Sequence, residues 1–344
     1  MSNWMIDAAK LDDEQLEILE LDPNDAKIVK GCAGSGKTVL AVHKADRVRK
    51  KALGSYYILV YTRALRAFIQ DGINELGIPD ANVMYEWDWR IRRNSPSADY
   101  LFIDESQDFS EQDIRFFVSK ANKAVVFFGD SAQQVYADGK INYVDQTREN
   151  TVNIEAIQKI TGLAAIKLKF NHRLPESVAK VAQCILASGE DIVSNCMKKG
   201  GDKPVLKKFT SSTAELDWII NKINNEQLTE VGILLSENTQ VKFVHDYFQS
   251  KGMKAGVRFS QDGKVIEALD FKGNISNIMP YHSSKGLQFD TVFLPFCEEN
   301  IQGGFWRNAF YVALSRTCKT LVITHTNGLS PFFSEISSSL YQKL

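Results

Sequence analysis

Short apolar runs separated by amphipathic stretches form two successive blocks along this chain. The first block extends to about Gly162 and the second begins near Ala165. The runs predict strands at Ala26–Val29, Tyr57–Tyr61, Leu101–Ile103 and Ala124–Phe128, and then at Ala165–Lys169, Glu230–Leu235, Asn277–Tyr281, Thr291–Leu294 and Thr320–Thr324. Because helical patterns lie between these runs, we expect an α/β fold in which mostly parallel sheets carry helices on both faces.

Apolar residues spaced three and four apart mark the helices, as Ala64, Leu65 and Phe68 do after Thr62. Helices are predicted at Val39–Lys50, after Thr62, and at Pro175–Ala187, Thr239–Lys251 and Arg307–Arg316. The polar stretches Asp138–Thr151 and Asn195–Lys208 are predicted to be loops. The pattern therefore indicates a first domain of residues 1–164 and a second domain of residues 165–344.

Composition and charge narrow the classes of protein that need consideration. The chain has 344 residues, 44% hydrophobic and 24% charged, which suits two globular domains. Its formal net charge is −1, so contact with nucleic acid would depend on a local groove rather than on bulk charge. The five cysteines are scattered without CxxC spacing, which argues against disulfides and zinc. Because neither a leader nor a membrane span is recognisable, we expect a cytoplasmic protein with no membrane partner.

One segment near the start of the chain carries a complete phosphate-binding pattern, G-x-x-x-x-G-K-[ST]. Its residues are Gly31, Cys32, Ala33, Gly34, Ser35, Gly36, Lys37 and Thr38. Glycines let consecutive backbone N–H groups surround a polyphosphate, and the following helix directs its positive end at it. Lys37 would reach the outer phosphates and Thr38 would ligate Mg²⁺. The segment predicts a site for a nucleoside triphosphate.

Acidic residues follow a later strand, where a partner for this loop would be required. Asp104 ends the run Leu101–Ile103 and is placed to bind Mg²⁺ or its water shell, and Glu105 is placed to deprotonate the attacking water. Gln133 follows the next strand and could sense the γ-phosphate or position the water. These residues predict hydrolysis of the triphosphate.

The phosphate-binding loop and seven further segments resemble the motifs of superfamily 1 DNA helicases of the UvrD/Rep/PcrA type. They follow one another in the family's order. The resembling segments are Leu11–Gln15, Tyr61–Arg63, Asp104–Asp108, Gly129–Tyr136, Asn171–Arg173, His282–Asp290 and Phe310–Thr317. The resemblance implies two RecA-like lobes with ATP between them, Gln15 on the adenine, and Arg173 and Arg316 at the γ-phosphate. Lobe closure would then couple hydrolysis to movement along single-stranded DNA.

Some positions depart from the family's motifs. His172 replaces the tyrosine expected to stack on adenine, and Gln288 replaces the glutamate expected near the ribose. Asp138 occupies the position where these motors often carry a base-stacking tryptophan. Because an aspartate cannot stack on a base, we expect weaker binding of a DNA strand. The residues left as candidate nucleic-acid contacts are Tyr61, Thr62, Tyr85, Trp87, Tyr136, His282 and Ser283. For Trp87 and its neighbour Trp89, packing in the core is an equal alternative.

The spacing between the motifs is short for this family. Only 67 positions separate Lys37 from Asp104, and 109 separate Arg173 from His282, so the family's accessory insertion domains do not fit. We therefore expect an ATPase that moves along single-stranded DNA, without robust unwinding of a duplex by this chain alone. The alternative is a regulatory subunit whose ATP-driven closure controls a protein partner, for example a nuclease in repair or anti-phage defence.

Overall fold

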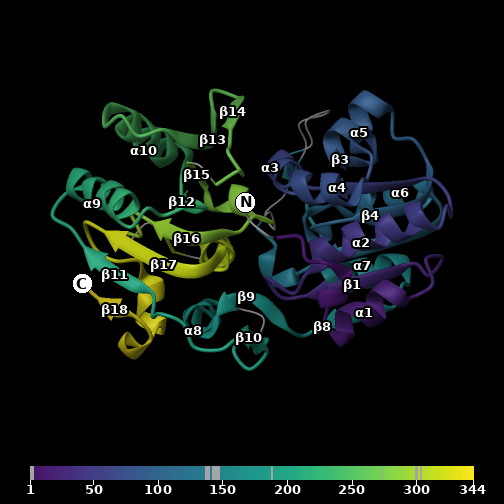
Figure 1. Ribbon diagram of the computed structural model, residues 1–344, viewed down its shortest axis with the longest axis horizontal. Coiled ribbons are helices and arrows are strands. Elements are labelled where there is room, and N and C mark those ends of the chain that lie inside the picture. The colour runs from purple at the N-terminus through teal and green to yellow at the C-terminus, as the bar shows by residue number, and fades with distance from the viewer. Residues whose placement is uncertain are drawn as a thin grey trace. The chain divides into compact units, whose positions relative to one another are not determined.

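The computed structural model describes residues 4–135, 140–141, 148–186, 189–273, 275–298, 301–302 and 304–344. The chain divides into two compact units, with the boundary between Phe170 and Asn171 (Figure 1). The sequence analysis placed the boundary between residues 164 and 165. The difference comes from β8 (Ala165–Leu168), which pairs with β1 (Lys27–Gly31) and therefore belongs to the sheet of the first unit.

A six-stranded parallel sheet forms the centre of the first unit, with the strand order β3-β2-β4-β5-β1-β8. Its other strands are β2 (Tyr56–Val60), β3 (Val83–Tyr85), β4 (Ala98–Ile103) and β5 (Ala121–Gly129). Because β4, β5 and β1 are neighbours and run in the same direction, the segments that follow them leave the sheet at one edge. A separate pair of short strands, β6 (Lys140–Ile141) and β7 (Arg148–Glu149), is antiparallel.

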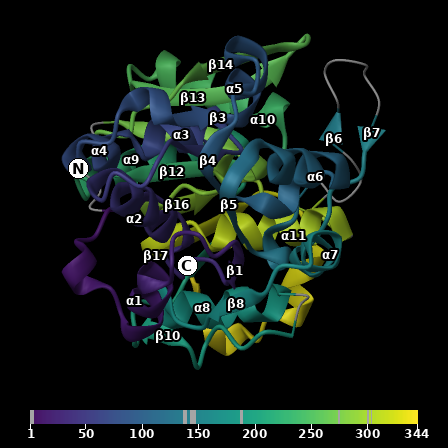
Figure 2. The same cartoon turned by 90° about the vertical axis from the view of Figure 1, so that its right-hand side faces the viewer.

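Helices cover both faces of this sheet, as the sequence predicted. They are α1 (Asp13–Glu20), α2 (Lys37–Lys50), α3 (Arg63–Phe68), α4 (Gln70–Leu76), α5 (Glu86–Arg93), α6 (Glu111–Lys120) and α7 (Ile154–Thr161). Trp89 of α5, Phe117 of α6 and Ile157 of α7 pack in one cluster with strand residues such as Leu101. Helices α6 and α7 lie side by side (Figure 2). Helix α2 contacts β1, β2, β4 and β5, and its buried residues are absent from that cluster.

An eight-stranded sheet forms the second unit, with the order β14-β13-β15-β12-β16-β17-β11-β18. Its strands are β11 (Val205–Lys208), β12 (Val231–Leu235), β13 (Ala255–Gln261), β14 (Lys264–Ala268), β15 (Ser276–Pro280), β16 (Phe289–Leu294), β17 (Thr317–His325) and β18 (Gln342–Lys343). The hairpin partners β13 and β14 are antiparallel, whereas the other neighbours pair in parallel. A two-stranded parallel sheet, β9 (Asn171–Pro175) with β10 (Cys196–Lys198), precedes it in sequence.

The helices of the second unit are α8 (Glu176–Ile185), α9 (Ser212–Asn225), α10 (Asn238–Ser250) and α11 (Gly304–Leu314). Helices α9 and α10 share one hydrophobic core with the sheet, in which Ile219 and Phe248 are fully buried against Ile233 and Phe293. Helix α11 packs instead against α8. The helical spacing that predicted α8, α10 and α11 is therefore the spacing of their buried faces.

The hydrophobic pattern missed several elements, among them α1, α6, α9 and the hairpin of β13 and β14. The stretch Asp138–Thr151, predicted to be a loop, contains the short strands β6 and β7. The stretch Asn195–Lys208, also predicted to be a loop, contains β10 and β11. These strands are short and rich in lysine, and Met197 and Lys198 are exposed, so no apolar alternation marks them. The strand β3 was missed because it has only three residues. Among the described residues, no helix is long and apolar enough to cross a membrane.

Candidate functional site: a nucleotide-binding loop and the motifs around it

The phosphate-binding pattern folds as a loop between β1 and α2. Gly36 caps α2 with φ of 87°, a left-handed conformation that glycine adopts without strain. The Nζ of Lys37 donates to the carbonyl oxygens of Gly31 and Cys32 at 2.7 and 2.9 Å. The ammonium group therefore lies over its own loop, where it would meet the phosphates of a bound nucleotide. The hydroxyl of Ser35 is buried and has no hydrogen-bond partner among the described residues, which leaves a donor inside the loop.

Gln15 joins this loop to the helix that precedes it. Its side chain completes the capping box of α1, where it accepts from the backbone N–H of Asp12 at 3.1 Å. Its Nε2 donates to the carbonyl oxygen of Ser35 at 3.0 Å. A side chain at Gly36 would bring a Cβ to 2.4 Å from that same nitrogen. Gln15 is thus fixed against the loop, which is compatible with its predicted place beside a base.

Thr38 and Asp104 lie together at the edge where β1 and β4 end. The Thr38 hydroxyl donates to Oδ2 of Asp104 at 2.6 Å, and the backbone N–H of Glu105 donates to Oδ1 at 2.9 Å. Burial and the neighbouring Glu105 carboxylate raise the pKa of Asp104 to about 6. A divalent cation beside this carboxylate would favour its charged form. Hydroxyl and carboxylate oxygens are the ligands Mg²⁺ prefers, so this pair fits the ion.

Glu105 begins a chain of side-chain contacts that the sequence analysis did not foresee. Its backbone is left-handed, with φ of 53°. Its carboxylate accepts from Nε2 of Gln107 at 2.7 Å, and the Oε1 of Gln107 accepts from the backbone N–H of Asp130 at 3.0 Å. Asp130 in turn accepts from Nε2 of Gln133 at 2.6 Å. Gln107 and Asp130 therefore connect the predicted base to Gln133, although only their motif context pointed to them.

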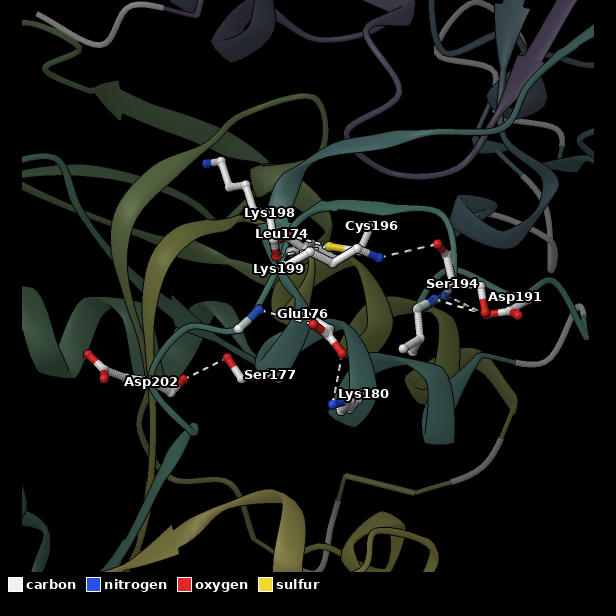
Figure 3. Close-up of polar contacts among 12 residues, drawn as sticks. Leu174, Glu176, Ser177, Lys180, Asp191, Ser194, Cys196, Lys198, Lys199 and Asp202 are labelled. Carbon is white, nitrogen blue, oxygen red and sulfur yellow. Dashed lines mark hydrogen bonds and ion pairs between the residues drawn. The ribbon is translucent and has the colours of Figure 1, made fainter.

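In the second unit, β9 carries His172 and Arg173 and is held by contacts from the segment after it. The Oδ1 of Asn171 accepts from the backbone N–H groups of Arg173 and Leu174 at 3.0 and 3.1 Å. The Cys196 thiol donates to the Leu174 carbonyl oxygen at 2.8 Å (Figure 3). These contacts fix the backbone on both sides of Arg173.

Figure 3 also shows how the neighbouring helix α8 holds the glycine-containing turn after β10. Glu176 accepts from the backbone N–H of Gly200 at 3.0 Å and pairs with Lys180 at 2.9 Å. Ser177 donates to the carbonyl oxygen of Asp202 at 2.7 Å. The hydrogen bonds to Gly200 and the ion pair with Lys180 lower the pKa of Glu176. The local fold therefore positions β9 with contacts from several elements of this unit.

The two arginines predicted at the γ-phosphate both contact Ser315. Arg173 donates to the Ser315 carbonyl oxygen at 3.2 Å, and Arg316 donates to the Ser315 hydroxyl at 2.8 Å. Arg316 is only 1% exposed and also donates to the carbonyl oxygens of Val312 and Leu287 at 2.9 and 3.3 Å. Arg316 therefore has a structural role in this arrangement, whereas Arg173 is partly exposed.

The nucleic-acid contacts predicted in the first unit have different environments. Thr62 caps α3 by accepting from the Leu65 N–H at 3.0 Å and is largely buried. Tyr61 packs edge-on against Phe109 with ring centroids 5.1 Å apart, yet remains partly exposed. Tyr85 and Trp87 are also partly exposed, so their rings can reach a ligand. Trp89, by contrast, is fully buried and belongs to the core.

The predicted contacts around residue 282 in the second unit are less accessible. Ser283 is 1% exposed, and its hydroxyl accepts from Arg258 of β13. Burial and the Arg258 charge lower the pKa of His282 to about 4, so its imidazole is neutral at physiological pH. Any contact of His282 with a nucleic acid would therefore be made by a neutral ring. Gln288 is partly exposed, and Tyr136 and Asp138 lie outside the described residues.

Two protein-family models match parts of the chain. An AAA domain matches residues 10–181, which is half of the chain, and a UvrD-like helicase C-terminal domain matches residues 265–328. The first match contains the phosphate-binding loop, Asp104, Glu105 and Arg173, and the second contains the segment around His282 together with Arg316. The two matches thus cover the residues that the sequence assigned to ATP.

Curated relatives and a solved structure are similar to parts of the chain. A "Probable DNA helicase II homolog" of Rickettsia conorii is 24% identical over 205 residues, and "DNA helicase II" of Rickettsia typhi is 24% identical over 206. Each match covers 55% of this chain and 29% of the relative, so the chain corresponds to under a third of their length. The C-terminal domain of a possible DNA helicase from Lactobacillus plantarum matches 50% of this chain and 98% of its own, with 17% identity and a TM-score of 0.39.

Proposed function

Because this chain belongs to the AAA domain family and contains a UvrD-like helicase C-terminal domain, we propose that it hydrolyses ATP and moves along single-stranded DNA. The observation that carries the proposal is the direct contact between Thr38 and Asp104 beside the loop of Lys37. A phosphate-binding loop and an acidic strand end, 66 residues apart in sequence, meet at one edge of the sheet. This is the pairing that hydrolysis of a triphosphate requires.

Different residues of the first unit bind different parts of ATP. Lys37 and the loop N–H groups bind the β- and γ-phosphates, and Gln15 lies beside the base. Thr38 and Asp104 would hold Mg²⁺, which neutralises phosphate charge when bound. Glu105 orients the attacking water and accepts its proton as the oxygen bonds to the γ-phosphorus and the bond to ADP breaks. Gln107 keeps the Glu105 carboxylate oriented through its hydrogen bond.

Arg173 and Arg316 supply positive charge to the γ-phosphate in this proposal. A guanidinium in that role contributes roughly 10³–10⁵ to the rate in related nucleotidases. Both residues contact Ser315, so a movement of that segment would affect them together. His172 and Gln288 are proposed to contact the base and the ribose.

The strand of DNA is proposed to contact the partly exposed aromatic residues of the first unit and the segment around His282. The test measures the ATPase rate of the whole chain with single-stranded DNA, duplex DNA and RNA at two salt concentrations. We expect strong stimulation by single-stranded DNA that weakens as salt increases. A rate that no nucleic acid changes would contradict the proposal.

A regulatory subunit is the second candidate function. It is favoured by the short spacing between motifs, 67 positions from Lys37 to Asp104 and 109 from Arg173 to His282, which leaves no room for the family's accessory insertion domains. A slow ATPase that is insensitive to DNA, together with stoichiometric co-purification of a protein partner, would favour this function over the first.

A further inference from the structure

A cleft on the surface of the first unit is not used by the motifs that bind ATP. It lies where α3 and α5, labelled in Figure 1, pack on β3. Its volume is about 270 Å³. The side chains that matter most for its chemistry are those of Arg66, Asp80, Tyr85, Asp88, Arg92 and Arg93. Pockets for whole small molecules usually enclose about 300–1,000 Å³. A cleft of this size suits one part of a longer ligand that lies across it.

Positive charge exceeds negative charge around the cleft. Asp80 pairs with Arg66, and Asp88 is shared by Arg63 at 3.3 Å and Arg92 at 3.1 Å. Arg93 also lines the cleft, and the structure records no ion pair for it among the described residues. Three guanidinium groups and two carboxylates therefore line the cleft, and Arg63 adds a fourth guanidinium beside Asp88.

Around Asp88 the guanidinium groups are the more accessible partners, whereas in the other ion pair Asp80 is 73% exposed and Arg66 is 16% exposed. The side chain of Arg92 is 70% exposed and that of Arg63 is 51% exposed, whereas Asp88 is 21% exposed. A guanidinium has five N–H donors, and Arg92 contacts Asp88 through Nε. Its terminal nitrogens are thus directed away from this contact and can bind an anion. Planar guanidinium groups match the oxygens of phosphate particularly well.

An aromatic ring borders the same positive surface. The guanidinium of Arg63 lies over the ring of Tyr85, 5.4 Å from its centroid, and Tyr85 lines the cleft. Arginines that follow a backbone, interleaved with an aromatic ring on which a base stacks, are the combination that binds single-stranded nucleic acids. An acidic protein segment would use the arginines but would not need the ring.

We propose that this cleft binds phosphate groups of a single-stranded nucleic acid through Arg92 and Arg93, with an adjacent base stacked on Tyr85. The inference rests on the proposed function, because it extends the surface on which the DNA strand would lie. It adds the end of α5 to that surface, which neither the motifs nor the similar proteins assign. Asp88 holds Arg92 and Arg63 in place while the phosphate is absent.

The test compares the whole chain with its R92A/R93A variant in binding a fluorescent oligothymidine of about 16 nucleotides. Fluorescence anisotropy gives Kd at several salt concentrations. Each phosphate contact on a single strand contributes about 0.7 to the slope of log K against log salt concentration, so we expect the variant's slope to be smaller by about 1.4. We also expect its Kd at low salt to be about tenfold higher.

A matched control and a second variant separate the contributions. Arg115 is 61% exposed on α6 and pairs with Glu111, so R115A removes a surface arginine away from the cleft and should leave both Kd and slope unchanged. Y85L removes the stacking ring, and it should raise Kd about 5- to 150-fold while leaving the salt slope unchanged. Thermal melts of all variants verify that they fold.

The outcomes distinguish this inference from the proposed function. If the parent chain does not bind the oligonucleotide, both fail. If the parent binds and R92A/R93A binds with the same Kd and slope, the inference is overturned while the proposed function stands. R92A/R93A could instead lose binding to a fluorescent polyglutamate peptide while its Kd for DNA stays unchanged. The cleft would then be a site for an acidic protein, and the inference would also be overturned.

Discussion

The motif residues of the two units differ in the groups to which they are hydrogen-bonded. In the first unit, side chains bond to groups of other motifs: the Thr38 hydroxyl donates to Asp104, and the Oε1 of Gln107 accepts from the Asp130 N–H. In the second unit, Arg316 donates mainly to main-chain carbonyl groups of its own unit and is fully buried. The first unit therefore assembles a nucleotide site from its own parts, whereas the second holds its arginines in the local fold.

A residue in a motif position can therefore stabilise the fold, contribute to the chemistry, or do both to different extents. Arg316 is fully buried and donates to Val312, Leu287 and Ser315, whereas Arg173 is partly exposed and donates to the Ser315 carbonyl oxygen. Removing Arg173 should therefore report on chemistry, and removing Arg316 should report on folding as well.

Arg173→Ala should lower kcat for ATP by roughly 10³–10⁵, because it removes a guanidinium that the proposal places at the γ-phosphate. Its melting temperature should stay close to that of the parent, since the Arg173 side chain is partly exposed. Steady-state kinetics and a thermal melt measure the two effects. Lys319→Ala, which removes an exposed cation from the same unit, is the control. Full activity in R173A would remove Arg173 from the catalytic site.

Glu105→Gln should lower kcat by roughly 10²–10⁴, the usual contribution of a general base. The amide cannot accept the proton of the attacking water, but the loop that binds the phosphates is unchanged. Binding of a fluorescent ATP analogue should therefore persist. Glu111→Gln, exposed at the start of α6, is the matched control. A parent-like rate in E105Q would show that another residue is the base.

Arg316→Ala should be destabilising, because the carbonyl groups of Val312 and Leu287 lose their buried donor. Leaving a buried acceptor unsatisfied costs about 1–3 kcal/mol, so the free energy of unfolding should fall by at least that amount. Chemical denaturation measures it. If R316A unfolds at the same denaturant concentration as R173A, the structural contrast between the two arginines is wrong.

Asp104→Asn should change how stability depends on pH. Because burial raises the pKa of Asp104 to about 6, the folded chain binds a proton more readily than the unfolded chain, and the free energy of unfolding falls as pH rises from about 4 to 6. The variant lacks this fall and should be more stable than the parent at pH 7 by about 3 kcal/mol. Thermal melts without Mg²⁺ between pH 4 and 8 measure this difference, with Asp71→Asn as the control.

A second buried carboxyl, in the other unit, allows the same measurement to be repeated there. Glu215 is fully buried in α9, accepts from the Phe296 N–H at 2.9 Å, and burial raises its pKa to about 7. The sign is the same, so stability should fall between about pH 4.5 and 7. Glu215→Gln should remove only the part of the pH dependence of stability that Glu215 contributes. Parallel pH profiles for the parent and both variants would contradict both assignments.

Gln15→Ala should have the smallest effect. It removes the bonds to the Asp12 N–H and the Ser35 carbonyl oxygen, which together contribute about 1–2 kcal/mol to stability. KM for ATP should rise modestly, because the loop loses its contact with α1. The control is Gln249→Ala on the exposed face of α10. An unchanged KM would confine Gln15 to helix capping.

Much of the candidate site could be predicted because its residues are neighbours in sequence. The phosphate-binding loop needs glycines, a lysine and a threonine at fixed short spacing, so the pattern names them before any fold is known. The same holds for the predicted strands at Tyr57–Tyr61 and Leu101–Ile103, whose continuous apolar runs correspond to buried β2 and β4. Short strands with lysine-rich, exposed faces, such as β10 and β11, carry no such signal.

The sequence alone determined the α/β class, the nucleotide loop and the order of the motifs, because each depends on local spacing or on apolar periodicity. Only the tertiary structure decided which distant groups meet: the Thr38 hydroxyl with Asp104, the Gln107 side chain with the Asp130 N–H, and Arg173 and Arg316 at Ser315. It also decided that β8 joins the first sheet, that Trp89 is core and that Ser283 is buried. Burial and pairing arise when segments far apart in the chain pack together, and no local pattern records which segments those will be.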